Sequence, residues 1–195
     1  DDDGGVEIAT AAIAVPIAML GEVAASRARY FDLSFVGWEA NNATSRMTAE
    51  TVVFGSGRPT ILLPELSEVV TLDHVAIAWD GSRVAARAVA DAGFLLRRVS
   101  RISVITVLDE KPLAEKDAGE RLAGMLRERG LNAQSVSINA QDCPIAETLQ
   151  QAAIEKGAGL LVMGGYGHSR IRDFVLGGAT EGVLSDLSMP VLLSH

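Results

Sequence analysis

Residues 74–82 have the sequence His-Val-Ala-Ile-Ala-Trp-Asp-Gly-Ser, a short apolar run that ends in a turn. Beyond the turn, apolar residues recur at helical spacing from Val84 to Leu95, as they do on the buried face of a helix. The next run, Arg101–Val107, is rich in β-branched residues, which favour strands. The sequence therefore predicts a strand, a tight turn, a helix and a second strand over residues 74–107.

The same alternation of strand and helix continues to the C-terminus. Further strands are predicted over residues 133–138, 159–163 and 190–193, and helices over 115–129, 144–156 and 180–187. Because helices fall between successive strands, we expect parallel strands in a sheet with helices on both faces. Residues 72–195 should therefore form a complete α/β domain around a five-stranded, parallel, doubly wound sheet of the flavodoxin-like kind.

Residues 1–66 repeat the last part of this pattern. Two stretches have counterparts further along the chain: residues 30–37 resemble 157–164, and residues 49–63 resemble 180–193. No counterpart of residues 75–107 precedes Val6, and a half-copy cannot close a core of its own. We therefore expect residues 1–66 to be the C-terminal half of a second, degenerate copy. It should dock on the complete domain or on another chain, unless upstream residues complete it.

Composition and charge exclude several classes of protein. Hydrophobic residues make up 48% of the chain, enough for a folded core. The formal net charge of -8 argues against nucleic-acid partners, which are bound by clustered lysine and arginine. No apolar run reaches the roughly 18 residues of a membrane span, so we expect no membrane association. The single cysteine, Cys143, allows no internal disulfide and indicates a reducing compartment, the cytoplasm.

Residues 164–180 carry the strongest functional signal, Gly-Gly-Tyr-Gly-His-Ser-Arg-Ile-Arg-Asp-Phe-Val-Leu-Gly-Gly-Ala-Thr. They follow a predicted strand, at the edge where parallel α/β sheets bind ligands, and the Asp80 turn lies at the same edge. Glycines let the backbone approach a phosphate chain, and successive N–H groups near a helix start hold oxygen anions. The segment therefore predicts a phosphate-binding loop. The alternative is a surface loop with solvated arginines, in which Asp80 is only a helix-cap or turn residue.

The spacing of these glycines resembles a known nucleotide-binding loop. This stretch is similar to the loop of the universal stress protein family. It consists of Gly164-x-x-Gly167, nine residues, Gly177, a helix and then Pro190-Val-Leu-Leu. The strand and turn around Asp80 resemble the first strand and turn of that family. The resemblance covers about residues 72–195 and implies an adenine nucleotide alpha hydrolase-like fold. Residues 1–66 resemble the second half of another repeat, as in the tandem members.

This resemblance implies an adenine nucleotide as the ligand: ATP, ADP or AMP. It leaves open whether Mg²⁺ binds together with the nucleotide. Asp80 would meet the adenosine end, Ala78 would line the base, and the backbone of Val107 would contact the adenine edge. Met163 and Gly164 would contact the ribose and phosphates. The phosphates would be held by Gly167, His168, Ser169, Gly177, Gly178, Ala179 and Thr180.

Two departures from the family pattern affect this expectation. Gly178 stands where the nucleotide-binding pattern has Ser or Thr, so one hydroxyl donor is lost. A neutral hydrogen bond contributes about 0.5–1.5 kcal/mol, up to about tenfold in affinity, which weakens the site without abolishing it. In the first copy the loop lacks the second glycine and carries Glu39. Because a carboxylate repels phosphate, we predict no nucleotide there.

No catalytic or metal site is assembled by motif. The sequence has no evident nucleophile with a base, no Walker A lysine and no zinc-type spacing of cysteine and histidine. The resemblance implies a stress-response sensor or regulator, and the missing motifs lead us to expect nucleotide binding without catalysis, with slow ATP hydrolysis beside His168 and Ser169 left open. The alternative is an interaction module that has lost its ligand. The apolar terminal strand, residues 191–193, leaves an open sheet edge, which predicts a homodimer or pairing with the first copy.

Overall fold

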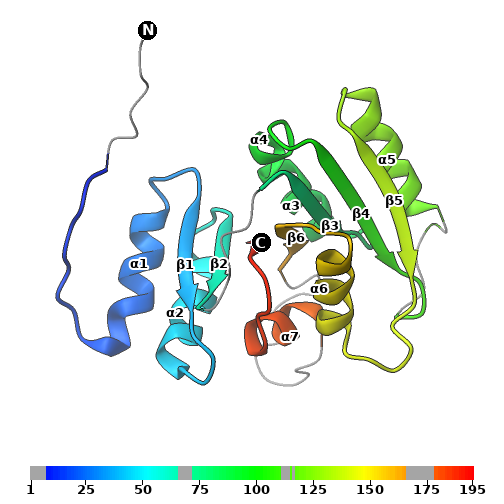
Figure 1. The fold of residues 1–195 in the computed structure, drawn as a ribbon. Helices are drawn as coiled ribbons and strands as arrows, with labels where there is room; N and C mark the ends of the chain where they lie inside the picture. The colour runs from blue at the N-terminus through cyan, green and yellow to red at the C-terminus, as the bar shows by residue number, and fades with distance from the viewer. Residues whose placement is uncertain (1–7, 66–71, 111–114, 116, 166–177) are drawn as a thin grey trace, which may run out of the picture.

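Seven strands form one continuous sheet, in the order β1-β2-β7-β6-β3-β4-β5 (Figure 1). The structure is a computed structural model that describes residues 8–65, 72–110, 115, 117–165 and 178–195. The strands are β1 (Ser34–Trp38), β2 (Thr60–Pro64), β3 (His74–Ala78), β4 (Arg101–Val107), β5 (Ala133–Ile138), β6 (Leu160–Gly164) and β7 (Val191–Ser194).

The strands of the C-terminal unit, β3 to β7, all pair in parallel. β3 lies at the centre of this unit, with β4 on one side and β6 on the other. The α/β class and the parallel pairing predicted for this part of the chain are therefore confirmed.

The sheet does not end at β7, and the expectation of a five-stranded sheet is wrong on this point. β2 pairs antiparallel with β7, with Ile61 opposite Leu192, and β1 pairs parallel with β2. Without β2, the apolar edge of β7 would leave backbone N–H and C=O groups unpaired. The N-terminal segment, predicted to be part of a second copy, therefore docks on the C-terminal unit and extends its sheet within one chain.

Helices cover both faces of the C-terminal unit. The helices of the described residues are η1 (Ile17–Met19), α1 (Leu20–Ala28), α2 (Ala43–Gly55), α3 (Arg83–Asp91), α4 (Gly93–Leu96), α5 (Ala118–Glu128), α6 (Ile145–Glu155) and α7 (Ala179–Ser185). Side chains of α2, α6 and α7 pack on one face and those of α3 and α5 on the other, which confirms the doubly wound arrangement there. α1 packs on α2. None of the helices in the described ranges is long and apolar enough to cross a membrane.

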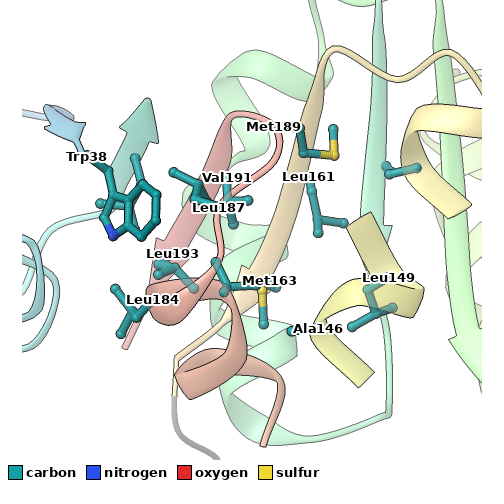
Figure 2. Packing of buried hydrophobic residues seen from close by; sticks show 14 of the residues in the cluster. Trp38, Ala146, Leu149, Leu161, Met163, Leu184, Leu187, Met189, Val191 and Leu193 are labelled. Carbon is teal, nitrogen blue, oxygen red and sulfur yellow. The ribbon is translucent and has the colours of Figure 1, made fainter. Parts of the chain in front are cut away.

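One apolar cluster joins the two parts of the chain. On the face covered by α6 and α7, Trp38 at the end of β1 belongs to the same buried cluster as Leu184 and Leu193 (Figure 2). Leu62 of β2 is fully buried in this cluster as well. The N-terminal segment thus shares its core with the C-terminal unit.

Local sequence signals set the ends of several helices. The Asn42 side chain accepts hydrogen bonds from the N–H groups of Thr44 and Ser45 and so caps α2. Gly130 and Gly157 follow α5 and α6 with φ angles of 81° and 74°, a region that favours glycine. These signals place the helices close to where the sequence predicts them.

Candidate functional site

The carboxyl ends of β3, β4 and β6 lie side by side at one edge of the sheet. β3 pairs with both neighbours, with Ala78 opposite Ile105 and Ile77 opposite Val162. The chain passes from β3 to β4 on one side and later enters β6 on the other. The strand order therefore reverses at β3, and ligands of parallel α/β sheets bind at such a point.

Asp80 lies in the turn that follows β3. Its Oδ1 atom accepts a 2.9 Å hydrogen bond from the Ser82 N–H. The Ser82 hydroxyl accepts a 3.2 Å hydrogen bond from the Ala85 N–H, so Ser82 is the cap of α3. The Trp79 N–H donates to the Ile105 carbonyl at 2.8 Å and ties the turn to β4. Asp80 is thus a turn residue rather than the helix cap, and its half-buried carboxylate lies at the site edge.

Gly164 ends β6 directly against the start of α3. A Cβ atom built on Gly164 would lie 2.5 Å from the carbonyl carbon of Val84 and 2.7 Å from the nitrogen of Ala85. Both are backbone atoms, so neither can turn aside as a side chain would. Only glycine therefore lets α3 begin beside the end of β6, which is a structural role independent of any ligand.

The start of α7 lies against the same end of β6. The hydroxyl of Thr180 donates to the Gly164 carbonyl over 3.4 Å, and Thr180 is buried. Gly178 has an extended backbone, and a Cβ atom there would meet no atom of the described residues within 4 Å. Ala179, between them, is half-buried. The Thr180 hydroxyl therefore joins α7 to β6, while the position of Gly178 has room for a larger side chain.

Val107, Met163 and Ala78 stand at the ends of their strands, as predicted. Val107 and Met163 are buried, and both belong to the cluster on the α6 and α7 face. Ala78 is half-buried and packs against the same cluster. Since the side chains of Val107 and Met163 fill the core, their backbone atoms are the groups that remain for a ligand at this edge.

Four of the predicted phosphate contacts lie outside the described residues. They are Gly167, His168, Ser169 and Gly177. The remaining members of the predicted set meet at one edge of the sheet, from four different elements. The residues predicted to meet the adenosine therefore lie at one edge of the sheet, and their contacts with a ligand stay a prediction.

Arg46 of α2 is a residue that the sequence analysis missed. Its guanidinium bonds the carboxylates of Glu50, at 2.9 Å, and Glu181 in the first turn of α7. Hydrogen bonds to Glu50 and then to Glu181 raise the pKa of Arg46 above its usual value. The first copy thus supplies a positive charge to a carboxylate beside the predicted phosphate loop. No sequence signal pairs two residues that lie so far apart in the chain.

Asp109, just beyond β4, is a second residue that the sequence did not single out. Its carboxylate accepts hydrogen bonds from the N–H groups of Ala140, at 2.7 Å, and Gln141, at 3.1 Å. These two bonds lower the pKa of Asp109. Gln141 and Asp142 have φ angles of 50° and 67°, which are uncommon for residues with a side chain. Asp109 therefore holds the loop after β5 in its conformation.

Metal-binding groups do not gather in the described part of the chain. No cluster there has three or more histidine, cysteine, aspartate or glutamate side chains placed to hold an ion. Cys143 is exposed.

Comparison with known proteins identifies the family. A sequence model of the universal stress protein family matches residues 71–195, more than half of the chain. The chain belongs to the universal stress protein family. A search of curated proteins finds no match.

Solved structures of universal stress proteins share the fold. A universal stress protein from Archaeoglobus fulgidus DSM 4304 is 18% identical, with a TM-score of 0.70, over 90% of this chain and 66% of that one. A putative universal stress protein from Pseudomonas aeruginosa UCBPP-PA14 is 16% identical, with a TM-score of 0.59, over 88% of this chain and 66% of that one. This chain thus spans slightly less than two thirds of either protein, and at such identities the likeness concerns the fold alone.

In this universal stress protein the loop between β1 and α2 caps the start of α2. Glu39 accepts a 2.6 Å hydrogen bond from the Asn42 side chain, and the Glu39 N–H donates to the Ser45 hydroxyl at 3.1 Å. Asn42 in turn caps α2. The polar groups of this loop are engaged with one another, and the absence of a nucleotide there stays a prediction.

Proposed function

We propose that this universal stress protein binds an adenine nucleotide at the carboxyl ends of β3, β4 and β6 and acts as a stress-response sensor or regulator. The observation that carries the proposal is the meeting of Asp80, Val107 and Gly164 at the point where the strand order reverses. Ligands bind at this point in parallel α/β sheets, and the family match covers the whole of this unit.

The residues at this edge suit the adenosine half of the ligand. The Asp80 carboxylate can accept hydrogen bonds from ribose hydroxyls, and backbone groups at the end of Val107 can pair with the adenine edge. Gly164 lets α3 begin directly beside the end of β6, so the Asp80 turn and the end of β6 belong to the same edge. The phosphates would extend toward Gly178, where the structure has open space.

The proposal also includes the ligand, the cellular compartment and the oligomeric state. The ligand is ATP, ADP or AMP, which can bring Mg²⁺ with it, and the proposed role is binding, with at most slow ATP hydrolysis. We place it in the cytoplasm because of its single cysteine. Since β2 already pairs with β7, the proposal needs no homodimer at that edge. The competing function, an interaction module without a nucleotide, is favoured by the hydroxyl missing at Gly178.

Isothermal titration of the purified chain with ATP, ADP and AMP separates the two functions. We expect a dissociation constant in the micromolar range for at least one nucleotide. A carboxylate in the phosphate loop, Gly167→Asp, should weaken this binding at least tenfold because it repels phosphate. Gly124→Asp on α5 places the same charge away from the site and should bind like the parent.

Two results would overturn the proposal. Absence of binding at millimolar nucleotide leaves the interaction module as the function. Equal affinity of Gly167→Asp and the parent, with both folded by circular dichroism, removes the loop from the site.

A further inference from the structure

A hollow of about 290 Å³ lies between α3 and α4 on one side and α5 on the other, on the face of the sheet opposite α6 and α7. The helices leave this space because α3 packs mainly on β6 and β7, whereas α5 packs on β4 and β5. Small residues line the side of α3 and α4, namely Ala86, Ala90 and Gly93. No large side chain from that side therefore fills the gap.

The walls of the hollow are mostly apolar. Val89, Leu96 and Leu126 line it and are buried members of the core cluster on this face. Met125 and Leu131 are half-buried and add further apolar surface. The volume is close to the lower end of the range for small-molecule pockets, roughly 300–1,000 Å³. A ligand of this hollow would therefore be small and would bind largely by removing apolar groups from water.

Two arginines lie at one end of this apolar hollow. Arg97 follows the last residue of α4 and Arg129 follows the last residue of α5, and both line the hollow. α3 and α5 each connect two parallel strands, so they run in the same direction and finish at the same end. No lining residue is acidic. In a chain of net charge -8, the two guanidiniums make this end locally positive.

The guanidiniums of these two arginines are available to a ligand. A positive charge near a helix C-terminus stabilises the helix, but it does not require a hydrogen bond from the side chain. Arg127, two residues before Arg129, has partners of its own, the Glu120 carboxylate and the Ala133 carbonyl. Among the described residues, neither Arg97 nor Arg129 has a side-chain hydrogen bond or an ion pair. Their N–H groups can therefore bind a carboxylate, which fits the fork of a guanidinium.

We propose that this hollow binds a medium-chain fatty carboxylate. The carboxylate would lie at Arg97 and Arg129, and the alkyl chain would extend past Val89 and Met125 toward Ala86. A neutral apolar molecule would leave the arginines unused, and a small inorganic anion would leave the apolar walls in water. A peptide would bury backbone amides against walls that offer them no hydrogen bonds. The hollow shares no residue with the nucleotide site, so this proposal does not depend on the proposed function.

Titration of the full chain with monomeric decanoate, followed by calorimetry and by the amide signals in NMR spectra, tests the proposal. We expect saturable binding at one site, with shifts of the amides of residues 86–97 and 125–131. Each CH₂ group that leaves water contributes up to about fourfold in affinity, so octanoate should bind about tenfold more weakly than decanoate. Decanol, which has the same chain without the carboxylate, should also bind at least tenfold more weakly.

Variants separate the charge from the apolar walls. The double variant Arg97→Gln, Arg129→Gln should weaken decanoate binding at least tenfold and leave decanol binding unchanged. Arg98→Gln is the matched control, because Arg98 is exposed and does not line the hollow, and it should change decanoate binding less than twofold. Ala90→Leu should weaken the binding of both molecules, since its side chain would occupy the hollow.

The arginines are exposed, so the melting temperature of the double variant should equal that of the parent, which separates a lost site from lost folding. Absence of saturable binding at millimolar decanoate overturns the proposal. Equal affinity of the double variant and the parent for decanoate, equal affinity of the parent for decanol and decanoate, or amide shifts confined to other residues overturn it as well.

Discussion

Gly178 is the residue whose replacement tests the site most directly. Its backbone is extended and its surroundings are open, so a serine fits without strain. Gly178→Ser should raise nucleotide affinity by up to about tenfold, because one neutral hydrogen bond contributes roughly 0.5–1.5 kcal/mol. Gly178→Ala is the matched control, since it changes the backbone freedom equally and adds no donor. Equal affinities of the two variants in calorimetry would show that no phosphate oxygen comes within reach of position 178.

His74 makes stability depend on pH through its buried imidazole. Arg101 donates to its Nδ1 atom at 2.9 Å, so the Nε2–H of the neutral ring faces the Ser103 hydroxyl, also at 2.9 Å. Burial, and then the charge of Arg101, lower the pKa of His74 below 6.5. The unfolded chain therefore binds the proton more readily, and this part of the stability, complete above about pH 6.5, is lost as pH falls through the folded pKa.

The measurement is urea unfolding at pH 7.5 and pH 5.5, for the parent and for His74→Gln. Glutamine keeps a donor toward Ser103 and has no charge to gain, so the variant should lose less stability between the two pH values than the parent does. An equal loss in both proteins would show that other groups control the pH dependence.

Helix packing in this fold depends on glycines at close contacts, as Gly182 in α7 illustrates. A Cβ atom on Gly182 would overlap the methyl group of Ala146 in α6. Gly182→Ala should therefore lower the free energy of unfolding by about 1–3 kcal/mol, the usual range for overpacking a core. Gly124→Ala on α5 should be neutral or stabilising, by up to about 1 kcal/mol, because alanine favours helices. Chemical denaturation compares the two, and a neutral Gly182→Ala would mean that α6 and α7 can separate at little cost.

The elements of the C-terminal unit could be predicted because each carries a local signal. The apolar run at residues 74–79 and the capping glycines Gly130 and Gly157 fix their elements by short-range chemistry. The apolar edge of β7 predicted a partner strand, either in a second molecule or in residues 1–66, and the structure places β2 there. The sequence left these two alternatives open, because complementarity between strands some 130 residues apart does not appear as a spacing. For the same reason, Arg46 beside Glu181 and Asp109 beside Ala140 became visible only in the folded chain.

The whole molecule should unfold as one unit, since the cluster of Figure 2 draws on both copies. The chain has two tryptophans, Trp38 at the end of β1 and Trp79 after β3. Each part of the molecule therefore has its own fluorescent reporter. In the single-tryptophan variants Trp38→Phe and Trp79→Phe, unfolding by urea followed by fluorescence should coincide with unfolding followed by circular dichroism.

A variant at the joint tests the same coupling. Leu62→Ala removes a fully buried side chain of β2 and should cost about 2–5 kcal/mol. If the unit is cooperative, the transition reported by Trp79 shifts as much as the one reported by Trp38. A shift confined to Trp38 would show that the half-copy unfolds on its own.

Because β2 and β7 are antiparallel, the carboxyl ends of the strands lie at two opposite rims of the sheet. The carboxyl ends of β1 and β2 point away from those of β3, β4, β6 and β7. Gly37 and the Asp80 turn consequently lie at opposite rims of one sheet. The nucleotide site proposed beside Asp80 therefore lies away from the end of β1, and any influence of one rim on the other has to travel across the sheet itself.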